Sequence, residues 1–288
     1  MALVGALALL ATACRNEPSP TVAAPPNPTS APASVLPGCV VDPGARAPAR
    51  PADHDYRIVQ PGILVAGSVT SLPPFESVQG SQPVGFDVAL IAEVARRLGL
   101  RPEVQTESPA HLLSDVAEGR TDVAISALTI RADRKSAVDF TDPYFTADLA
   151  LTVGVAQARG FKGVEALAGK VVGVAGGSWS ETCARLVLQQ RAKLAGLQTY
   201  ADMSKAFTDL AVGRLGAVLA DLPTSNRLAQ AVPGVQIVQI YRTGDAYGIA
   251  VAKSNPNLRE VINRVLADIR ADGTYALIYR TWFQVPPP

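Results

Sequence analysis

One segment of this sequence occurs twice, and the repeat limits how the chain can fold. The first copy spans residues 115–125 (DVAEGRTDVAI) and the second spans residues 209–219 (DLAVGRLGAVL). Each copy is typical of the end of a helix, a glycine stop followed by arginine, and then a short apolar strand. Two such units in one chain predict two α/β lobes that face each other.

Other short apolar runs predict further strands after residue 53. They lack a clean polar–apolar alternation, which is typical of parallel strands covered on both faces, and they span residues 63–66, 123–125, 171–174, 217–220 and 249–252. Helical patterns lie between them. Asp87 is expected to cap a helix that Gly99 ends, and a second apolar stripe precedes Gly273. We therefore predict an α/β protein of two lobes, each a mainly parallel sheet flanked by helices.

The N-terminal region predicts export and a lipid anchor. Residues 1–13 are apolar and end in small residues before Cys14, which suits a secretory signal peptide of the lipoprotein type, with Cys14 as the acylated residue. Ala11 stands where leucine is usual, and no Lys or Arg precedes the apolar run. A plain signal peptide with an incidental cysteine, and a true start upstream of Met1, therefore stay open.

Residues 14–52 are rich in Pro, Ala, Ser and Thr and predict a disordered tether. The chain has three cysteines, Cys14, Cys39 and Cys183. If Cys14 carries lipid, a disulfide between Cys39 and Cys183 is one possibility in an oxidising compartment. The sequence alone does not decide whether the two residues lie close enough to pair.

Candidate binding residues come directly after the repeated strands, because ligands of open α/β sheets bind beyond the carboxyl ends of the strands. The first copy is followed by Ser126 and Ala127, then by Thr129 and Arg134. Arg134 is expected one turn into a helix, where it could hold a carboxylate in a bidentate grip. The alternative is a solvated arginine paired with Asp133 or Asp139.

The second lobe offers a complementary set. A glycine-rich turn leads to Ser178 and Trp179, whose backbone amides could hold an anion. Asp221 comes after the second repeated strand and could bind an ammonium group; alternatively, it caps the helix that contains Pro223. A guanidinium group facing a carboxylate matches the charges of an α-amino acid zwitterion.

Composition argues against several other classes of protein. The net charge of +1 gives no sign of a nucleic-acid partner, and the two histidines form no metal-ligand pattern. No phosphate-binding loop is visible, so we expect neither a metal nor a cofactor. No membrane span comes after the last helical pattern, which argues against a receptor domain.

Several motifs in order resemble the amino-acid-binding proteins of ABC importers, solute-binding protein family 3. The resemblance covers about residues 56–283; the motifs are Pro73-Pro74-Phe75, Gly85-Phe86-Asp87-Val88, Gly119-Arg120-Thr121-Asp122, the segment 129–134, Asp139-Phe140-Thr141-Asp142-Pro143-Tyr144, the segment 167–174, and Asp272-Gly273-Thr274-Tyr275 before Trp282-Phe283.

The resemblance implies a role for each candidate residue. Arg134 would bind the ligand carboxylate with help from positions 127, 129 and 178, and Asp221 would bind the ammonium group. It also implies a periplasmic-binding-protein fold with a two-strand hinge near residues 147–151 and 242–247. Lobe 1 would then span residues 53–147 and 247–288, and lobe 2 residues 148–246. The predicted ligand-binding residues are Leu72, Phe75, Ser126, Ala127, Thr129, Arg134, Ser178, Trp179 and Asp221.

Departures from the family pattern bear on the ligand. Leu72 stands where an aromatic residue usually packs on the ligand side chain, Arg131 replaces a common threonine, and Gly216 replaces a common aspartate. Val69 stands where binders of basic amino acids often have a carboxylate. A neutral polar or acidic amino acid is therefore expected as ligand.

The expected function is binding without catalysis. A monomer held at the outer face of the membrane by lipid on Cys14 would pass the amino acid to an ABC permease. The alternative is an enzyme on the same fold, such as a periplasmic cyclohexadienyl dehydratase, with Glu76, Glu181 or Asp245 as its acid.

Overall fold

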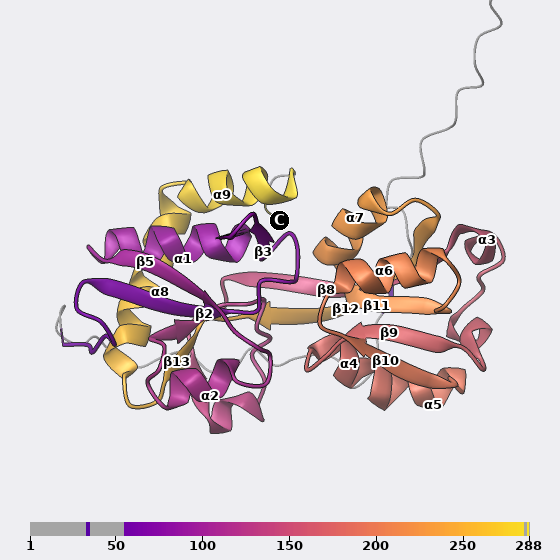
Figure 1. The fold of residues 1–288 in the computed structure, drawn as a ribbon, viewed down its shortest axis with the longest axis horizontal. Helices are drawn as coiled ribbons and strands as arrows, with labels where there is room; N and C mark the ends of the chain where they lie inside the picture. The colour runs from indigo at the N-terminus through magenta and orange to yellow at the C-terminus, as the bar shows by residue number, and fades with distance from the viewer. Residues whose placement is uncertain (1–32, 35–54, 285–286, 288) are drawn as a thin grey trace, which may run out of the picture. The chain divides into compact units, whose positions relative to one another are not determined.

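The computed structural model describes residues 33–34, 55–284 and 287 (Figure 1). Two β-sheets of five and six strands, each covered by helices, build the folded part. We call the part built on the five-stranded sheet lobe 1 and the part built on the six-stranded sheet lobe 2. The α/β class and the two-lobed organisation predicted from the repeat are both confirmed.

The lobe 1 sheet has the strand order β5-β2-β6-β13-β7. Its strands are β2 (Ile63–Ser68), β5 (Arg101–Thr106), β6 (Val123–Ala124), β7 (Val138–Phe140) and β13 (Ala250–Ala252). β3 (Ser77–Gln79) and β4 (Gln82–Val84) follow β2 in the chain and form a separate two-stranded hairpin. The helices are α1 (Phe86–Arg97), α2 (Leu112–Ala117), the 3₁₀ turn η2 (Arg134–Ser136), α8 (Pro256–Ala271) and α9 (Thr274–Phe283).

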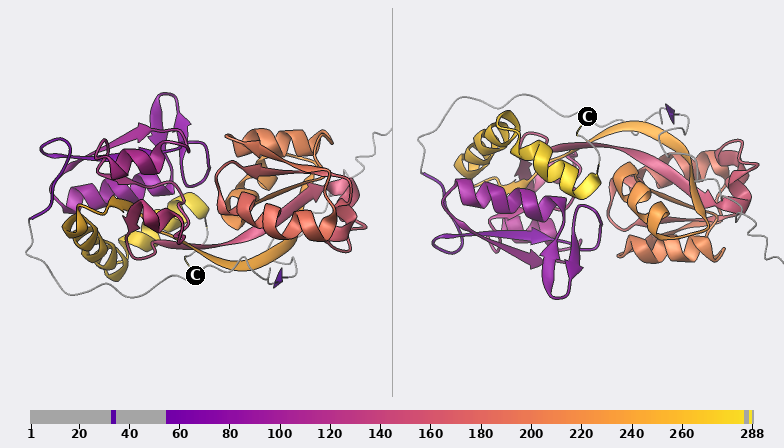
Figure 2. Two further views of the ribbon diagram at one scale, coloured as in Figure 1. Left: turned by 90° about the horizontal axis from the view of Figure 1, so that it is seen from below. Right: turned by 90° about the horizontal axis from the view of Figure 1, so that it is seen from above.

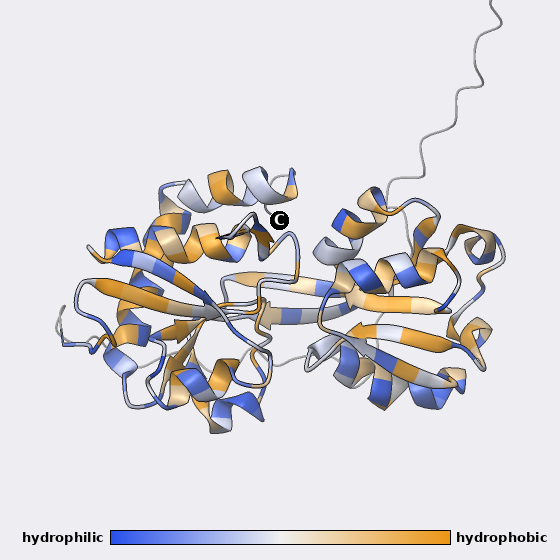
Figure 3. Cartoon of the chain, viewed as in Figure 1, coloured by the Kyte–Doolittle hydropathy of each residue, from blue (hydrophilic) through white to orange (hydrophobic). Residues whose placement is uncertain are grey.

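Alternate residues of each lobe 1 strand point to opposite faces of the sheet. Leu64, Val123 and Ile249 pack under α1, α8 and α9, whereas Ala124 and Ala250 pack against α2 on the other face. Because both faces are covered, the central strands β2, β6 and β13 are apolar at nearly every position, which explains the uninterrupted runs in the sequence. Figure 3 shows the resulting concentration of hydrophobic residues along β2.

The lobe 2 sheet has the strand order β1-β12-β8-β11-β9-β10. Its strands are β1 (Ala33–Ser34), β8 (Phe145–Gly154), β9 (Val171–Ala175), β10 (Gly196–Tyr200), β11 (Ala217–Asp221) and β12 (Val235–Tyr247). The helices are α3 (Val155–Ala158), η3 (Val164–Leu167), α4 (Trp179–Cys183), the π-helical η4 (Ala184–Leu188), α5 (Gln189–Ala192), α6 (Met203–Ala211) and α7 (Leu222–Ala231).

Both sheets are mixed, although a mainly parallel arrangement was expected. β9, β10 and β11 pair in parallel, as do β2, β5 and β6. The antiparallel pairs involve strands that return from the other lobe or from the end of the chain: β8 and β12 in lobe 2, and β13 in lobe 1. Short apolar runs alone did not reveal this direction, because strands buried on both faces have similar compositions in either orientation.

Strands β8 and β12 are the two crossings between the lobes, and they pair with each other from Phe145 to Gly154 (Figures 1 and 2). The register shifts between Tyr241 and Asp245, which leaves an irregular segment in β12. Asp148 on β8 holds this segment: its Oδ1 accepts hydrogen bonds from the backbone N–H groups of Thr243 and Gly244, at 3.2 and 3.4 Å, and its Oδ2 accepts one from Arg242. The expected two-strand hinge is therefore present.

The capping role expected for Asp87 is wrong. Gly85 is the N-cap of α1, and Asp87 is a fully buried residue within the helix. Its Oδ2 accepts hydrogen bonds from the backbone N–H of Ala127 at 2.7 Å and from the hydroxyl of Tyr144 at 2.8 Å. Asp87 thus joins α1 to the segment that comes after β6.

The predicted signal peptide, the tether and the lipid-modified Cys14 lie outside the described residues. Cys183 is fully buried in lobe 2 and is disulfide-bonded, but its partner is also outside them. The pairing with Cys39 therefore stays a prediction. No helix within the described residues is long and apolar enough to cross a membrane.

Candidate functional site

A cavity of about 290 Å³ lies between segments of the two lobes and the crossing strands. This volume is at the small end of the range for ligand pockets, roughly 300–1,000 Å³, and suits a small molecule. Lobe 1 contributes residues from positions 69–76, 109–113 and 126–134. Lobe 2 contributes residues from positions 175–180, 200–203 and 220–221, and the crossing strands add Leu149, Asp245 and Tyr247.

Most of the residues predicted to bind a ligand line this one cavity. They are Leu72, Ser126, Ala127, Thr129, Arg134, Ser178, Trp179 and Asp221. Phe75 is the exception: its side chain is fully buried in an aromatic cluster with Phe86, Phe145, Tyr247 and Phe283, and it does not line the cavity. The expectation for Phe75 is corrected, because its ring packs in the core of lobe 1.

The turn after β6 is held by buried acids. Ala127 has a left-handed backbone conformation (φ 44°), and its N–H donates to Asp87. The hydroxyl of Ser126 donates to Glu76 Oε1 at 2.6 Å and accepts a hydrogen bond from the N–H of Val69. These bonds fix the backbone of the turn where it faces the cavity, although alanine rarely adopts this conformation.

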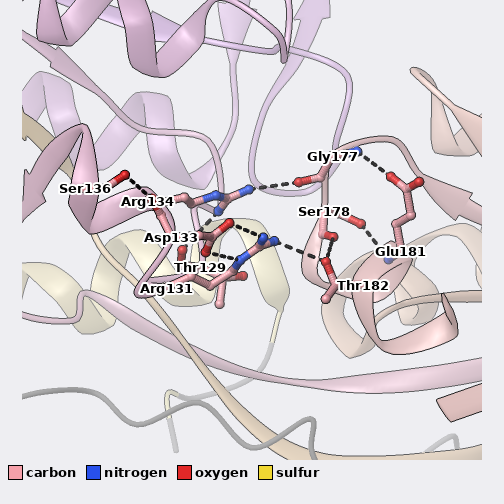
Figure 4. Close-up of polar contacts among 9 residues, drawn as sticks. All are labelled: Thr129, Arg131, Asp133, Arg134, Ser136, Gly177, Ser178, Glu181 and Thr182. Atoms are coloured by element: carbon pink, nitrogen blue, oxygen red, sulfur yellow. Dashed lines mark hydrogen bonds and ion pairs between the residues drawn. The ribbon is translucent and has the colours of Figure 1, made fainter. Parts of the chain in front are cut away.

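Arg134 begins a single 3₁₀ turn, whereas an α-helix was expected there. Its Nη1 donates to the carbonyl of Thr129 at 3.0 Å, and its Nη2 donates to the carbonyl of Gly177 in lobe 2 at 2.9 Å (Figure 4). Neither Asp133 nor Asp139 pairs with it: Asp133 binds Arg131, and Asp139 binds Arg259. Burial, with a smaller effect from the charge of Arg131, lowers the pKa of Arg134 to about 10, so the guanidinium group remains charged at neutral pH.

Ser178 caps the short helix α4. Its hydroxyl accepts a hydrogen bond from the N–H of Glu181 at 3.2 Å and donates to the carbonyl of Ala175 at 2.7 Å. The side chain of Trp179, the first residue of the helix, lies under the guanidinium group of Arg131, whose Cζ is 5.4 Å from the ring centroid. This edge of the cavity is therefore shaped by local capping and by a contact from lobe 1.

Asp221 caps a helix and also faces the cavity. Its Oδ1 accepts a hydrogen bond from the N–H of Thr224 at 2.9 Å and so caps α7, with Pro223 in the first turn. The residue also lines the cavity, and it is 7% exposed. Burial raises the pKa of its carboxyl group, so a cation placed beside it would favour the ionised form.

Sequence reasoning named Glu76 and Asp245 only as candidate acids of the enzyme alternative and did not assign Tyr247 to a site, yet all three line the cavity. Thr243 lies beside Asp245, but neither carboxylate oxygen of Asp245 has a hydrogen bond within the described residues, and burial raises its pKa to about 8. Its place in the predicted crossing segment 242–247 was the available signal. Likewise, Tyr200 and Met203 could have been found by applying the strand-end rule to β10.

Glu76 and Asp87 form a buried acidic pair behind the turn after β6. Burial, followed by the charge of Asp87, raises the pKa of Glu76 well above its usual value. Burial raises the pKa of Asp87 to about 7, against the hydrogen bonds from Ala127 and Tyr144, which lower it. The pair therefore holds at least one proton around neutral pH.

One of the three acids named for the enzyme alternative lies away from the cavity. Glu181 does not line the cavity, and its carboxylate is bound by Arg185 and by the N–H of Gly177. Among the described residues, no three His, Cys, Asp or Glu side chains are placed to share a metal ion.

The chain is similar to known binding proteins over most of its length. It is 29% identical over 234 residues to the L-cystine-binding protein TcyJ of Escherichia coli strain K12. The matched region covers 79% of this chain and 85% of that protein. An ancestral arginine-binding protein bound to arginine is 36% identical, covers 77% of this chain and 98% of its own, and superposes with a TM-score of 0.72. The same kind of ancestral protein bound to glutamine is 35% identical, covers 78% of this chain and 100% of its own, and has a TM-score of 0.70.

A family model matches residues 64–285, which include both repeated segments and every residue placed at the cavity. This chain belongs to the bacterial extracellular solute-binding proteins, family 3.

Proposed function

We propose that Arg134 and Asp221 hold the two ends of an amino-acid zwitterion in this chain, which is an amino-acid-binding protein of an ABC importer. Arg134 would bind the α-carboxylate and Asp221 the α-ammonium group. The observation that carries the proposal is that a guanidinium group without a carboxylate partner in the described residues lines the same cavity as Asp221. Charge-assisted hydrogen bonds of this kind contribute roughly 1.5–3 kcal/mol each.

Substitution of Arg134 and of Asp221 tests this assignment. A thermal-shift screen of the full chain against the common L-amino acids first identifies a ligand, because a ligand that binds only the folded state raises the melting temperature. Calorimetric titration should then show affinity at least about tenfold weaker for Arg134→Ala and for Asp221→Asn. Asparagine keeps an acceptor for the N–H of Thr224, so the helix cap is preserved in the second variant.

The matched control is Arg120→Ala, since Arg120 pairs with Asp115 and Glu118 and does not line the cavity. Its affinity should equal that of the wild type. Wild-type affinity in both Arg134→Ala and Asp221→Asn would refute the assignment.

The charges around the cavity bear on the ligand side chain, for which a neutral polar or acidic group was expected. Arg131 is already bound by Asp133, and Arg134 is assigned to the α-carboxylate. Glu76, Asp221 and Asp245 then give this part of the cavity an excess of carboxyl groups, which can donate to a neutral polar side chain when protonated and ionise beside a cationic one. We therefore propose a ligand with a neutral polar or cationic side chain and drop the acidic class. The related ancestral protein bound to arginine and to glutamine supports this choice.

Glutamine and glutamate provide a matched test of side-chain charge, because they have nearly the same shape. Calorimetric titration should give at least about tenfold weaker binding for L-glutamate than for L-glutamine, since no unpaired cation in the described lining can receive a second carboxylate. Equal or tighter binding of L-glutamate would return the acidic class to consideration.

We also propose the location and assembly expected from the sequence. Family membership supports an extracytoplasmic site of action, because the relatives of this chain include periplasmic binding proteins. The lipid on Cys14 and the monomeric state rest on the sequence, and labelling with a palmitate analogue and light scattering are the respective tests.

A further inference from the structure

We propose that Arg131 is a positioning residue that latches lobe 1 to lobe 2 and thereby sets how tightly every ligand is held. It would act on the equilibrium between open and closed lobes. Arg131 lines the cavity, but its Nε, Nη1 and Nη2 are bound by Asp133 and Thr182, so it would not hold the ligand itself. The proposal rests on the proposed function only in its affinity measurements. The observation behind it is that the lobes touch each other directly at places outside the two crossing strands.

Arg131 makes two contacts with lobe 2. Its Nη1 lies 3.3 Å from the hydroxyl oxygen of Thr182 (Figure 4). Its Cζ is 5.4 Å from the centroid of the Trp179 ring. Both partners belong to α4. A guanidinium group stacked on an indole ring combines a cation–π attraction with the burial of two flat surfaces. These contacts form only when α4 lies against the segment after β6.

Asp133 holds Arg131 in the orientation that these contacts need. The Nε and Nη2 groups of Arg131 donate to the two carboxylate oxygens of Asp133 at 3.0 and 2.5 Å, and the Arg131 side chain is only 17% exposed. The two residues lie on the same lobe, so this pairing persists when the lobes separate. The guanidinium group is thus oriented before closure, and little side-chain freedom is lost when it meets Trp179.

A second contact lies near a different part of the cavity. Ser71 Oγ donates to the carbonyl of Ala201 at 2.6 Å, and Leu72 packs against the hydrophobic clusters of both lobes. The positions of Leu72 and Arg131 both depart from the family pattern. The two departures therefore coincide with two places where lobe 1 touches lobe 2 directly.

A latch has a different signature from a ligand contact. The apparent affinity equals the intrinsic affinity multiplied by the fraction of protein that is competent to close, so loss of a latch weakens all ligands by the same factor. The contacts exist in the closed arrangement of the lobes, with or without ligand, and they must break before a bound ligand can leave. Their loss should therefore accelerate dissociation and change association little.

The test uses the full chain with Arg131→Gln, and L-arginine and L-glutamine as probes. We expect affinity to fall by about threefold to tenfold, and by the same factor for both probes. Stopped-flow measurements should show that the fall comes from a faster dissociation rate. Small-angle scattering without added ligand should show a larger radius of gyration for the variant. Arg120→Gln is the matched control, because Arg120 also pairs with neighbouring carboxylates of lobe 1 but is 53% exposed and touches only that lobe in the described contacts.

A second variant guards against misfolding of the first. Thr182→Val removes the acceptor from lobe 2 at nearly constant volume, and Thr182 does not line the cavity. It should shift the same quantities in the same direction by a smaller factor.

Loss of affinity for one probe only would overturn the proposal and make Arg131 a ligand contact. Unchanged scattering together with unchanged affinities would overturn it as well. If neither probe binds the wild type, the proposed ligand class is at fault, and the scattering of the two variants still decides whether the latch exists.

Discussion

The two copies of the repeated segment build the same corner in the two lobes. In lobe 1 the N–H of Arg120 donates to the carbonyl of Asp115 at 2.7 Å, and in lobe 2 the N–H of Arg214 donates to that of Asp209 at 2.9 Å. The glycine before each arginine has a left-handed conformation, with φ of 72° and 78°. Each arginine side chain also binds the carboxylate of the aspartate five residues earlier. The repeat is therefore a structural corner that directs each chain segment into its sheet.

The copies differ in the neighbours of the corner and in the residues at the end of the strand. Asp209 also accepts hydrogen bonds from Tyr200 and Lys205, whereas Asp115 has Glu107 as an acidic neighbour. β11 ends in Asp221, an acid that caps a helix, while β6 leads to a turn that buried, proton-holding acids support. The comparison shows that a shared scaffold positions both strand ends, and that residues outside the repeat decide their chemistry.

The largest expected difference is between the buried acids at and behind the cavity and the acid of the lobe 2 corner, which respond differently to pH. Burial raises the pKa of Asp87 to about 7 and of Asp245 to about 8, whereas hydrogen bonds from Lys205 and Arg214 lower that of Asp209 to about 2. The unfolded chain releases its carboxyl protons near pH 4. Stability from the raised groups is therefore complete below pH 4 and is lost as pH rises toward 8. We expect the free energy of unfolding in urea to fall by about 3–6 kcal/mol between pH 5 and pH 8, because each raised group alone accounts for about 3 kcal/mol.

Asp245→Asn serves as the control for this pH dependence, since asparagine does not titrate. The fall in the free energy of unfolding should be smaller in this variant, with the part due to Asp87 remaining. A free energy of unfolding that is constant or rises over the same range would show that the pKa values of the buried acids are not raised.

A smaller effect should separate the two corners themselves. Asp209 is 5% exposed and bonds to three side chains, so Asp209→Asn should lower the melting temperature by about 3–6 °C. Asp115→Asn removes mainly the pairing with Arg120, whose side chain is 53% exposed, and should lower it by at most about 2 °C. Differential scanning calorimetry measures both. A larger effect at Asp115 would show that the corner of lobe 1 carries more of the stability.

Much of the fold could be predicted because the central strands of both lobes are buried on both faces. Each of the five apolar runs became a strand within one or two residues, as in 171–174 and β9. Strand direction could not be predicted, because it depends on the crossings β8 and β12, which pair residues far apart in the sequence. Asp87 was misassigned for a similar reason. Its partners, Ala127 and Tyr144, are 40 and 57 residues away.

The candidate site was partly visible from the sequence because internal symmetry locates strand ends. Asp221 and Ser126 were found in this way, and both line the cavity. Glu76 and Asp245 were considered only as acids of an enzyme and not as ligand-binding residues, since neither lies at the end of a repeated strand. Phe75 was assigned from a motif, although motifs do not distinguish a ligand contact from a core residue.

The irregular segment of β12 that Asp148 holds offers a practical use. Arg242 lies in this segment with a side chain that is 67% exposed, and it does not line the cavity. A cysteine placed there could carry an environment-sensitive fluorophore whose signal reports bending at the crossing. The chain would then serve as an optical sensor for its own ligand, with the reporting dye kept apart from the chemistry that selects the ligand.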